Sequence, residues 1–202
     1  MEYEEREIKF YLQNLEAIRE RLRICGAEET RPRMLERNLR LDTADKSLQK
    51  EGRLLRLRQD DQVWVTFKAN ARTDGGVIAR TEIEFRADDF VVVRKLFEAL
   101  GYQVVVIYEK YRQVFTIGDV EVTLDELPFG HFMEIEASSN ILIEGVAQML
   151  GLDWSKGLAT NYLGLFAIAK RNADLQFNDL TFDNFAGLHL DYQALEVEPA
   201  DL

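Results

Sequence analysis

Residues 5–10 read EREIKF, in which Glu5, Glu7 and Lys9 occupy every second position. Side chains two residues apart lie on one face of a β-strand. The stretch therefore predicts a strand that carries two carboxylates and an amine on the same side. Carboxylates this close repel each other, and a strand at the edge of a sheet has no need of that arrangement. This face is either ordinary solvated surface or one half of a binding site.

The same alternation of charged and apolar residues recurs in five later segments: LLRLR (54–58), RTEIEFR (80–86), EKYR (109–112), VEVTLDE (120–126) and FMEIE (132–136). A plain sheet with its polar face in water explains any one of them. Over six strands that explanation weakens, because a solvated face usually mixes Thr, Ser, Gln and Asn with the charges. If the sheet closes on itself, the charged faces converge on a lumen where acids and bases must pair or hold ions.

The rest of the chain predicts the elements around these segments. Strands are expected at 3–11, 33–42, 53–60, 62–69, 77–86, 103–117, 119–126 and 131–137. Helices are expected after the cap Asn14, from about Asp88 as cap to Leu100, from Asn140 to Leu150 and from Ala159 to Arg171. Strands linked mostly by hairpins, with few helices, predict an α+β fold built on an antiparallel sheet or barrel.

Length and composition indicate a globular protein. The chain has 202 residues, of which 47% are apolar and 10% aromatic, enough for one domain with a sizeable core. A single cysteine excludes an intrachain disulfide and a thiolate metal site. The first residues are charged and lack the apolar segment of a signal peptide, and no stretch approaches the roughly 18 apolar residues of a membrane span. We therefore expect a cytoplasmic protein without membrane contact.

The net charge of −11 is unevenly distributed. Residues 172–202 hold seven acids and no Lys or Arg, which leaves 25 bases against 29 acids in residues 1–171. We expect residues 1–171 to form the main domain and residues 172–202 to form an acidic extension that docks on it. Trp64, between Val63 and Val65, is expected to pack rather than to stack on a base. The aromatic residues do not form a nucleic-acid platform.

The charged residues of the strands suggest one chemistry when they are grouped by sign. Carboxylates without His or Cys suit a hard cation such as Mg²⁺ or Mn²⁺. Arginine and lysine in such number suit a polyanion, and arginine in particular makes forked contacts to phosphate oxygens. Together they describe a site for a metal-bound polyphosphate.

At this point the residues carry a family resemblance. Residues 5–9 (EREIK) resemble the N-terminal E-x-E-x-K signature of the CYTH superfamily, the triphosphate tunnel metalloenzymes. Six further segments resemble the family's other motifs and follow in the same order: NLRLDT (38–43), GRLLRLR (52–58), TFK (66–68), RTEIE (80–84), KYR (110–112) and LD (124–125) with GHFMEIE (130–136). Seven ordered pieces make the resemblance specific. One departure is Thr160-Asn161-Tyr162, where the family often has Ser-Tyr, so Tyr162 is expected to brace the tunnel end without taking part in chemistry.

The resemblance implies an eight-stranded antiparallel closed β-barrel with flanking helices, whose tunnel binds a triphosphate through one or two divalent cations. The metal would be held by Glu5, Glu7 and Glu136, with Glu134 and Asp125 alongside. The phosphates would be lined by Lys9, Arg56, Arg58, Lys68, Arg80, Lys110 and Arg112. The residues expected to assist the chemistry are Glu82 and Glu84, which would orient the bases or the attacking water, together with Lys9.

The activity expected from this resemblance is divalent-metal-dependent hydrolysis of inorganic tripolyphosphate, thiamine triphosphate or a nucleoside triphosphate, in which a metal-activated water attacks the terminal phosphate. The alternative is a class IV adenylyl cyclase, which would convert ATP to cyclic AMP and pyrophosphate in the same tunnel. A non-catalytic polyphosphate-binding module is a third reading. The expected partner is a small-molecule triphosphate rather than a nucleic acid, although the 5′-triphosphate end of an RNA and a homodimer are left open.

Overall fold

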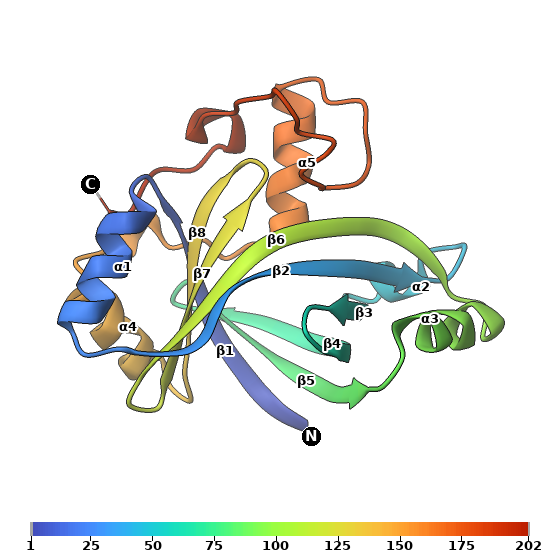
Figure 1. Cartoon of the computed structure of the whole chain (residues 1–202), viewed down its shortest axis with the longest axis horizontal. Coiled ribbons are helices and arrows are strands. Elements are labelled where there is room, and N and C mark those ends of the chain that lie inside the picture. The colour runs from blue at the N-terminus through green and yellow to red at the C-terminus, as the bar shows by residue number, and fades with distance from the viewer. Residues whose placement is uncertain (1, 202) are drawn as a thin grey trace.

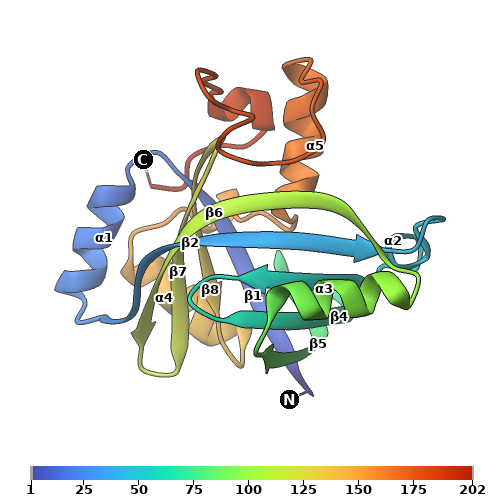
Figure 2. The same ribbon diagram turned by 45° about the vertical axis from the view of Figure 1, so that its right-hand side comes forward.

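The computed structural model describes residues 2–201, and for residues 2–5 and 74 it describes the backbone only. Eight strands form one closed barrel in the order β1-β5-β4-β3-β2-β6-β7-β8, and every neighbouring pair is antiparallel (Figures 1 and 2). The predicted barrel with flanking helices is confirmed. The strands are β1 (Glu2–Leu12), β2 (Glu28–Asp42), β3 (Leu54–Gln59), β4 (Val63–Asp74), β5 (Val77–Ala87), β6 (Gln103–Ile117), β7 (Val120–Leu127) and β8 (Gly130–Glu136).

The helices begin where side chains can cap them. They are α1 (Leu15–Ile24), α2 (Ser47–Lys50), α3 (Phe90–Ala99), α4 (Asn140–Met149) and α5 (Tyr162–Asn172), with short 3₁₀ turns η1 (Trp154–Lys156) and η2 (Tyr192–Leu195). The cap of α3 is Asp89 and not Asp88, because the Asp89 carboxylate accepts the N–H groups of Val91 and Val92. Helix α5 begins later than expected, since the Asn161 side chain accepts the N–H of Gly164. In the described part of the chain, no helix has the length and apolar character needed to cross a membrane.

The predicted alternation places apolar side chains outside the barrel and charged ones inside it. On β3, Leu55 and Leu57 are buried in an outer cluster with Phe90 and Phe97 of α3. A second outer cluster lies beneath α1 and α4 and contains Ile8 of β1. Because the helices cover this outer face, the intervening polar residues of each strand are directed into the barrel.

Helix α5 closes one end of the barrel. Its residues Leu165 and Phe166 belong to a buried cluster with Phe129 and Phe132 at the β7–β8 hairpin. Figure 1 shows α5 standing above β6 and β8, at the edge of the barrel away from the N-terminus. The first turn of α5, which includes Tyr162, therefore reaches the interior of the barrel.

Residues 173–201 run over α5 and return to β1. Leu180 exchanges backbone hydrogen bonds with β6, from its own N–H to Ile107 O and from Glu109 N–H to its carbonyl, both 2.9 Å. This stretch of β6 lies beyond the part paired with β7, which covers 111–117. At the end of the chain, the Asp201 carboxylate accepts the N–H groups of Gln13 and Asn14 at 2.8 and 2.7 Å. The extension therefore contacts β6 and the start of α1 as well as α5.

Candidate active site

The barrel encloses a cavity of about 400 Å³ that is lined by charged side chains. Of the described residues, nine bases line it: Lys9, Arg31, Arg40, Arg56, Arg58, Lys68, Arg80, Lys110 and Arg112. Six acids line it as well: Glu7, Glu82, Glu84, Glu121, Glu134 and Glu136. Among the described residues that line the cavity, bases therefore outnumber acids, although the net charge of the chain is −11. Of the predicted site residues whose side chains the structure describes, the cavity brings together all but Asp125.

Three carboxylates stand in one row across neighbouring strands. Glu7 on β1 is directly opposite Glu136 on β8, and Glu136 is directly opposite Glu121 on β7. We call Glu7, Glu136 and Glu121 the acid row. Directly opposed like charges destabilise a sheet, so the row favours a bound cation. Arg80 partly neutralises it by donating from Nη2 to Glu7 Oε1 at 2.7 Å.

The acid row has the ligand chemistry of a hard divalent cation. It offers carboxylate oxygens without nitrogen or sulfur, as Mg²⁺ and Mn²⁺ prefer. Among the described residues, no three His, Cys, Asp or Glu side chains already converge on a point, so the row is a set of neighbours rather than a finished cage. The predicted ligand Glu5 has a backbone position opposite Arg80 on β5, but its side chain lies outside the described residues.

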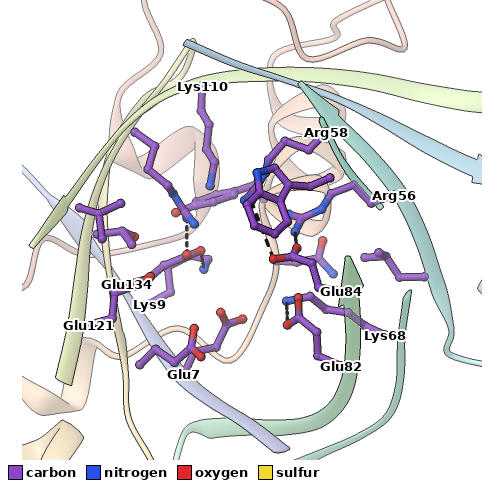
Figure 3. A pocket seen from close by; sticks show the side chains of 18 of the residues that line it. Glu7, Lys9, Arg56, Arg58, Lys68, Glu82, Glu84, Lys110, Glu121 and Glu134 are labelled. Carbon is purple, nitrogen blue, oxygen red and sulfur yellow. Dashed lines mark hydrogen bonds and ion pairs between the residues drawn. The ribbon is translucent and has the colours of Figure 1, made fainter. Parts of the chain in front are cut away.

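A second network joins Lys9, Arg112 and Glu134 beside the acid row. Glu134 accepts hydrogen bonds from the Lys9 ammonium and from the Arg112 guanidinium. Burial by itself would raise the pKa of Glu134, but the charges of Lys9 and Arg112 outweigh it and hold the pKa well below its usual range. Glu134 is therefore ionised at neutral pH and orients two cations at the cavity wall (Figure 3).

Asp125 lies behind the cavity wall and holds Arg112 together with a further cation, Lys110. Its carboxylate is fully buried and accepts from Lys110 at 3.0 Å, from both ends of Arg112, and from the Tyr162 hydroxyl at 2.7 Å. Burial and the Asp125 charge raise the pKa of Tyr162 well above its ordinary value, so the hydroxyl stays protonated and donates. The Tyr162 ring also lies beneath the Lys9 ammonium, 4.4 Å from ring centroid to Nζ.

The two acids expected to assist the chemistry are each held by a base. Lys68 Nζ lies 2.7 Å from Glu82 Oε2, and the Arg56 guanidinium lies 3.5 Å from Glu84 Oε2. The Thr66 hydroxyl donates to Glu84 at 2.6 Å. Figure 3 shows these pairs across the cavity from Glu121 and Glu134. Both acids therefore face the interior with an orientation set by their partners.

Two residues of β2 that face the lumen, Glu36 and Arg40, were not predicted as site residues. Glu36 is 1% exposed and lies 3.5 Å from Lys110 and 3.7 Å from Arg58. Burial would raise its pKa, but the charges of Lys110, Arg112 and Arg58 lower it to about 2. Arg40 lines the cavity on the same face of the strand. The signal was present, because positions 36, 38 and 40 share one face, but the neutral Asn38 interrupts the run of charges.

Two aromatic residues, Tyr108 and Trp64, also line the cavity although the sequence did not predict it. Tyr108 on β6 is buried, and although burial raises the pKa of its hydroxyl, the charges of Arg56 and Lys110 lower it below the ordinary value. Trp64 was expected to pack, but it lines the cavity while its neighbours Val63 and Val65 join the outer cluster. Its ring lies 5.5 Å from the Arg58 guanidinium, and its buried indole N–H has no hydrogen-bond partner among the described residues.

Known proteins resemble the chain in both sequence and fold. The family model described as CYTH domain matches residues 4–142. A Methanocaldococcus jannaschii protein, provisionally named an adenylate cyclase, is 27% identical over 134 residues, which are 65% of this chain and 75% of that protein.

Among solved structures, a Vibrio parahaemolyticus protein, also provisionally named an adenylate cyclase, superposes with a TM-score of 0.73 at 22% identity and covers 81% of this chain and 97% of its own. A Hippeastrum protein, provisionally named an adenylyl cyclase and reported to have a dominant triphosphatase activity, superposes with a TM-score of 0.59 at 18% identity, covering 81% of this chain and 95% of its own. At these identities the two structures show a shared fold.

Proposed function

The chain belongs to the CYTH domain family, and from this premise we propose that it is a divalent-metal-dependent hydrolase that releases the terminal phosphate of a triphosphate. The observation that supports the proposal is that one cavity contains both a row of carboxylates and a surrounding set of bases. The acid row suits a hard cation, and the bases that surround it suit a polyanion. A triphosphate with a bound metal carries both charges at once.

The chain's own residues would hold the substrate as follows. Glu7, Glu136 and Glu121, together with the predicted ligand Glu5, would bind Mg²⁺ or Mn²⁺. When bound, the ion would supply Lewis-acid charge to the phosphate oxygens and lower the pKa of a coordinated water. Lys9 lies two residues from Glu7 on the same face of β1 and would contact the phosphate nearest the acid row. Glu134 and Asp125, with Tyr162 behind them, keep Lys9, Lys110 and Arg112 directed at the phosphates.

The reaction we propose is attack of a water oxygen on the terminal phosphorus. The bond from that phosphorus to the bridging oxygen breaks, and orthophosphate and the shortened polyphosphate leave. Glu82 or Glu84 would accept the proton of the water, since both face the cavity. Lys68 and Arg56, which hold these acids in place, would stabilise the charge that develops on the phosphoryl oxygens.

Adenylyl cyclase activity is the second candidate, and Trp64 is the observation that favours it. An indole ring at the cavity wall, whose buried N–H has no partner in the described part of the chain, can stack on a base and donate to it. The cyclase names of relatives from Methanocaldococcus jannaschii and Vibrio parahaemolyticus agree with a nucleotide substrate. We rank hydrolysis first, because the Hippeastrum relative combines a cyclase name with dominant triphosphatase activity.

One experiment separates these activities. The protein is incubated with Mg²⁺ or Mn²⁺ and either tripolyphosphate, ATP or thiamine triphosphate, and orthophosphate, pyrophosphate and cyclic AMP are measured. Orthophosphate release that is lost in Glu136→Gln and retained in the exposed-site control Glu29→Gln supports the hydrolase. Formation of cyclic AMP with equimolar pyrophosphate would show that the protein is an adenylyl cyclase and not the proposed hydrolase. Tight binding of all three substrates without any product leaves a polyphosphate-binding module.

A further inference from the structure

Arg40 differs from the other bases of the cavity because it pairs with none of the acids that the structure describes. Eight of the nine cavity-lining bases have a carboxylate oxygen within 4.0 Å of a side-chain nitrogen. Among the described residues, Arg40 alone of the nine forms no ion pair, and its buried Nε has no hydrogen-bond partner. A buried donor without a partner is costly, so this guanidinium needs an anion that the described chain does not supply.

The strand register makes the position of Arg40 more unfavourable still. Arg40 on β2 is directly opposite Arg56 on β3, and like charges in opposed positions repel. Burial lowers the pKa of Arg40, and the charge of Arg56 lowers it further. The Tyr108 hydroxyl of β6 lies 3.5 Å from Arg56 Nη1 and lines the same cavity. Two guanidinium groups and a hydroxyl thus surround one part of the cavity.

The barrel topology fixes where this part lies relative to the acid row. In the closed order β1-β5-β4-β3-β2-β6-β7-β8, strand β2 is four places from β1 and strand β3 is four places from β8. The pair Arg40–Arg56 therefore lies across the barrel from the pair Glu7–Glu136. A ligand anchored through a cation at the acid row must cross the lumen to reach Arg40.

We propose that Arg40 and Arg56 together bind the phosphoryl group of the substrate that lies farthest from the acid row, and so select three linked phosphates over two. This inference rests on the proposed function and names a binding residue for it. The forked guanidinium groups match phosphate oxygens, and the bound anion relieves the repulsion between them. A diphosphate held at the acid row is too short to make this contact.

The test compares Arg40→Gln with Arg37→Gln, a control on the exposed outer face of the same strand. Binding of tripolyphosphate and of pyrophosphate is measured by calorimetry with Mg²⁺ present, and the melting temperature is measured without ligand. Loss of a charge-assisted contact should weaken tripolyphosphate binding by about 10- to 100-fold in Arg40→Gln. Pyrophosphate binding should change less than about threefold, and the ligand-free melting temperature should hold or rise because the repulsion is gone. Arg37→Gln should match the wild type in all three measurements.

The outcomes separate this inference from the proposed function. If the wild type binds neither compound, the proposed function fails. If the wild type binds tripolyphosphate and Arg40→Gln binds it equally well, only the inference fails. If Arg40→Gln weakened the binding of both compounds equally, Arg40 would not distinguish three linked phosphates from two, and the inference would be overturned. A lower ligand-free melting temperature or loss of folding in Arg40→Gln, with Arg40→Lys failing to restore tripolyphosphate binding, would assign Arg40 a structural role and overturn it as well.

Discussion

Neutralising Glu36 should remove an acid-sensitive part of the protein's stability. This carboxylate is 1% exposed, and its nearest charged neighbours are Lys110 and Arg58 at 3.5 and 3.7 Å. Burial alone would raise its pKa, but the surrounding bases lower it from 4.5 to about 2. The folded protein therefore holds Glu36 ionised more firmly than the unfolded chain does.

The size of the effect follows from the two pKa values. They differ by about 2.5, and each unit corresponds to about 1.4 kcal/mol, so ionisation of Glu36 stabilises the fold by about 3 kcal/mol at pH 7. Because the folded-state pKa is depressed, this stability is fully present above the unfolded value of 4.5 and is lost as the pH falls toward 2. By pH 3 about 2 kcal/mol of it should be gone.

The assay is urea unfolding of the wild type, Glu36→Gln and Glu29→Gln at pH 7 and pH 3. Glu29 is an exposed acid on the same strand and serves as the matched control. The difference in free energy of unfolding between the wild type and Glu36→Gln should shrink by about 2 kcal/mol between the two pH values. The corresponding difference for Glu29→Gln should stay nearly constant. A Glu36→Gln difference that is the same at both pH values would refute the reasoning.

Three further predictions concern the site and its supports. Glu7→Gln should lower turnover of tripolyphosphate by roughly 10², the scale of losing one electrostatic stabiliser, and wild-type phosphate release in this variant would remove Glu7 from the site. Chelation of divalent cations should stop phosphate release and added Mg²⁺ or Mn²⁺ should restore it, whereas undiminished release in excess chelator would contradict a metal-dependent reaction. Phe185→Ala should lower the free energy of unfolding by about 3 kcal/mol, since this buried ring of the extension contacts Phe129, Phe166 and Phe177. The exposed Phe85→Ala should cost less than about 0.5 kcal/mol, and equal costs for the two would show that the extension does not stabilise the barrel.

The parity of charges along each strand was predictable because it is a local property. Once Arg56 and Arg58 are separated by Leu57, any strand that buries the leucine under a helix must direct both arginines to the other side. The same reasoning holds for Glu82 and Glu84 on β5. The cavity lining could therefore be anticipated strand by strand, and the ordered family pieces supplied the closure of the barrel.

The partners of these residues were not predictable, because they depend on register between distant strands. The pairing of β2 with β6 shifts between Glu29 and Arg31 and again between Arg31 and Met34. Pro32, which has no N–H to donate to the ladder, indicates an irregularity at the second shift, but the local sequence does not give its size or the resulting register. Glu121 stands opposite Glu136 for a different reason, because β7 and β8 form one hairpin closed at Pro128-Phe129, and the pair follows only once that turn is placed at these two residues.

Trp64 illustrates a different limit of sequence reasoning. Apolar neighbours on both sides make packing the ordinary expectation for an indole, and Val63 and Val65 do pack in the outer cluster. The parity argument, applied to Lys68 and Thr66 on the same strand, places Trp64 on the inner face with them. The large apolar surface of the ring favoured a packed position outside a polar lumen. This expectation was preferred to the inner position that the two-residue alternation of the strand predicts.

The register also places like charges opposite one another at two places on opposite sides of the barrel. The acid row opposes carboxylates across β1, β8 and β7, and Arg40 opposes Arg56 across β2 and β3. Each arrangement is unfavourable alone, and a cation at the first with an anion at the second relieves both. A metal-bound triphosphate that spans the lumen carries these charges in that order. Its binding should therefore stabilise the fold by more than the metal and orthophosphate do when these are added together. The comparison is made at matched multiples of the dissociation constants, and the reason is that neither small ion links the acid row to the pair Arg40–Arg56.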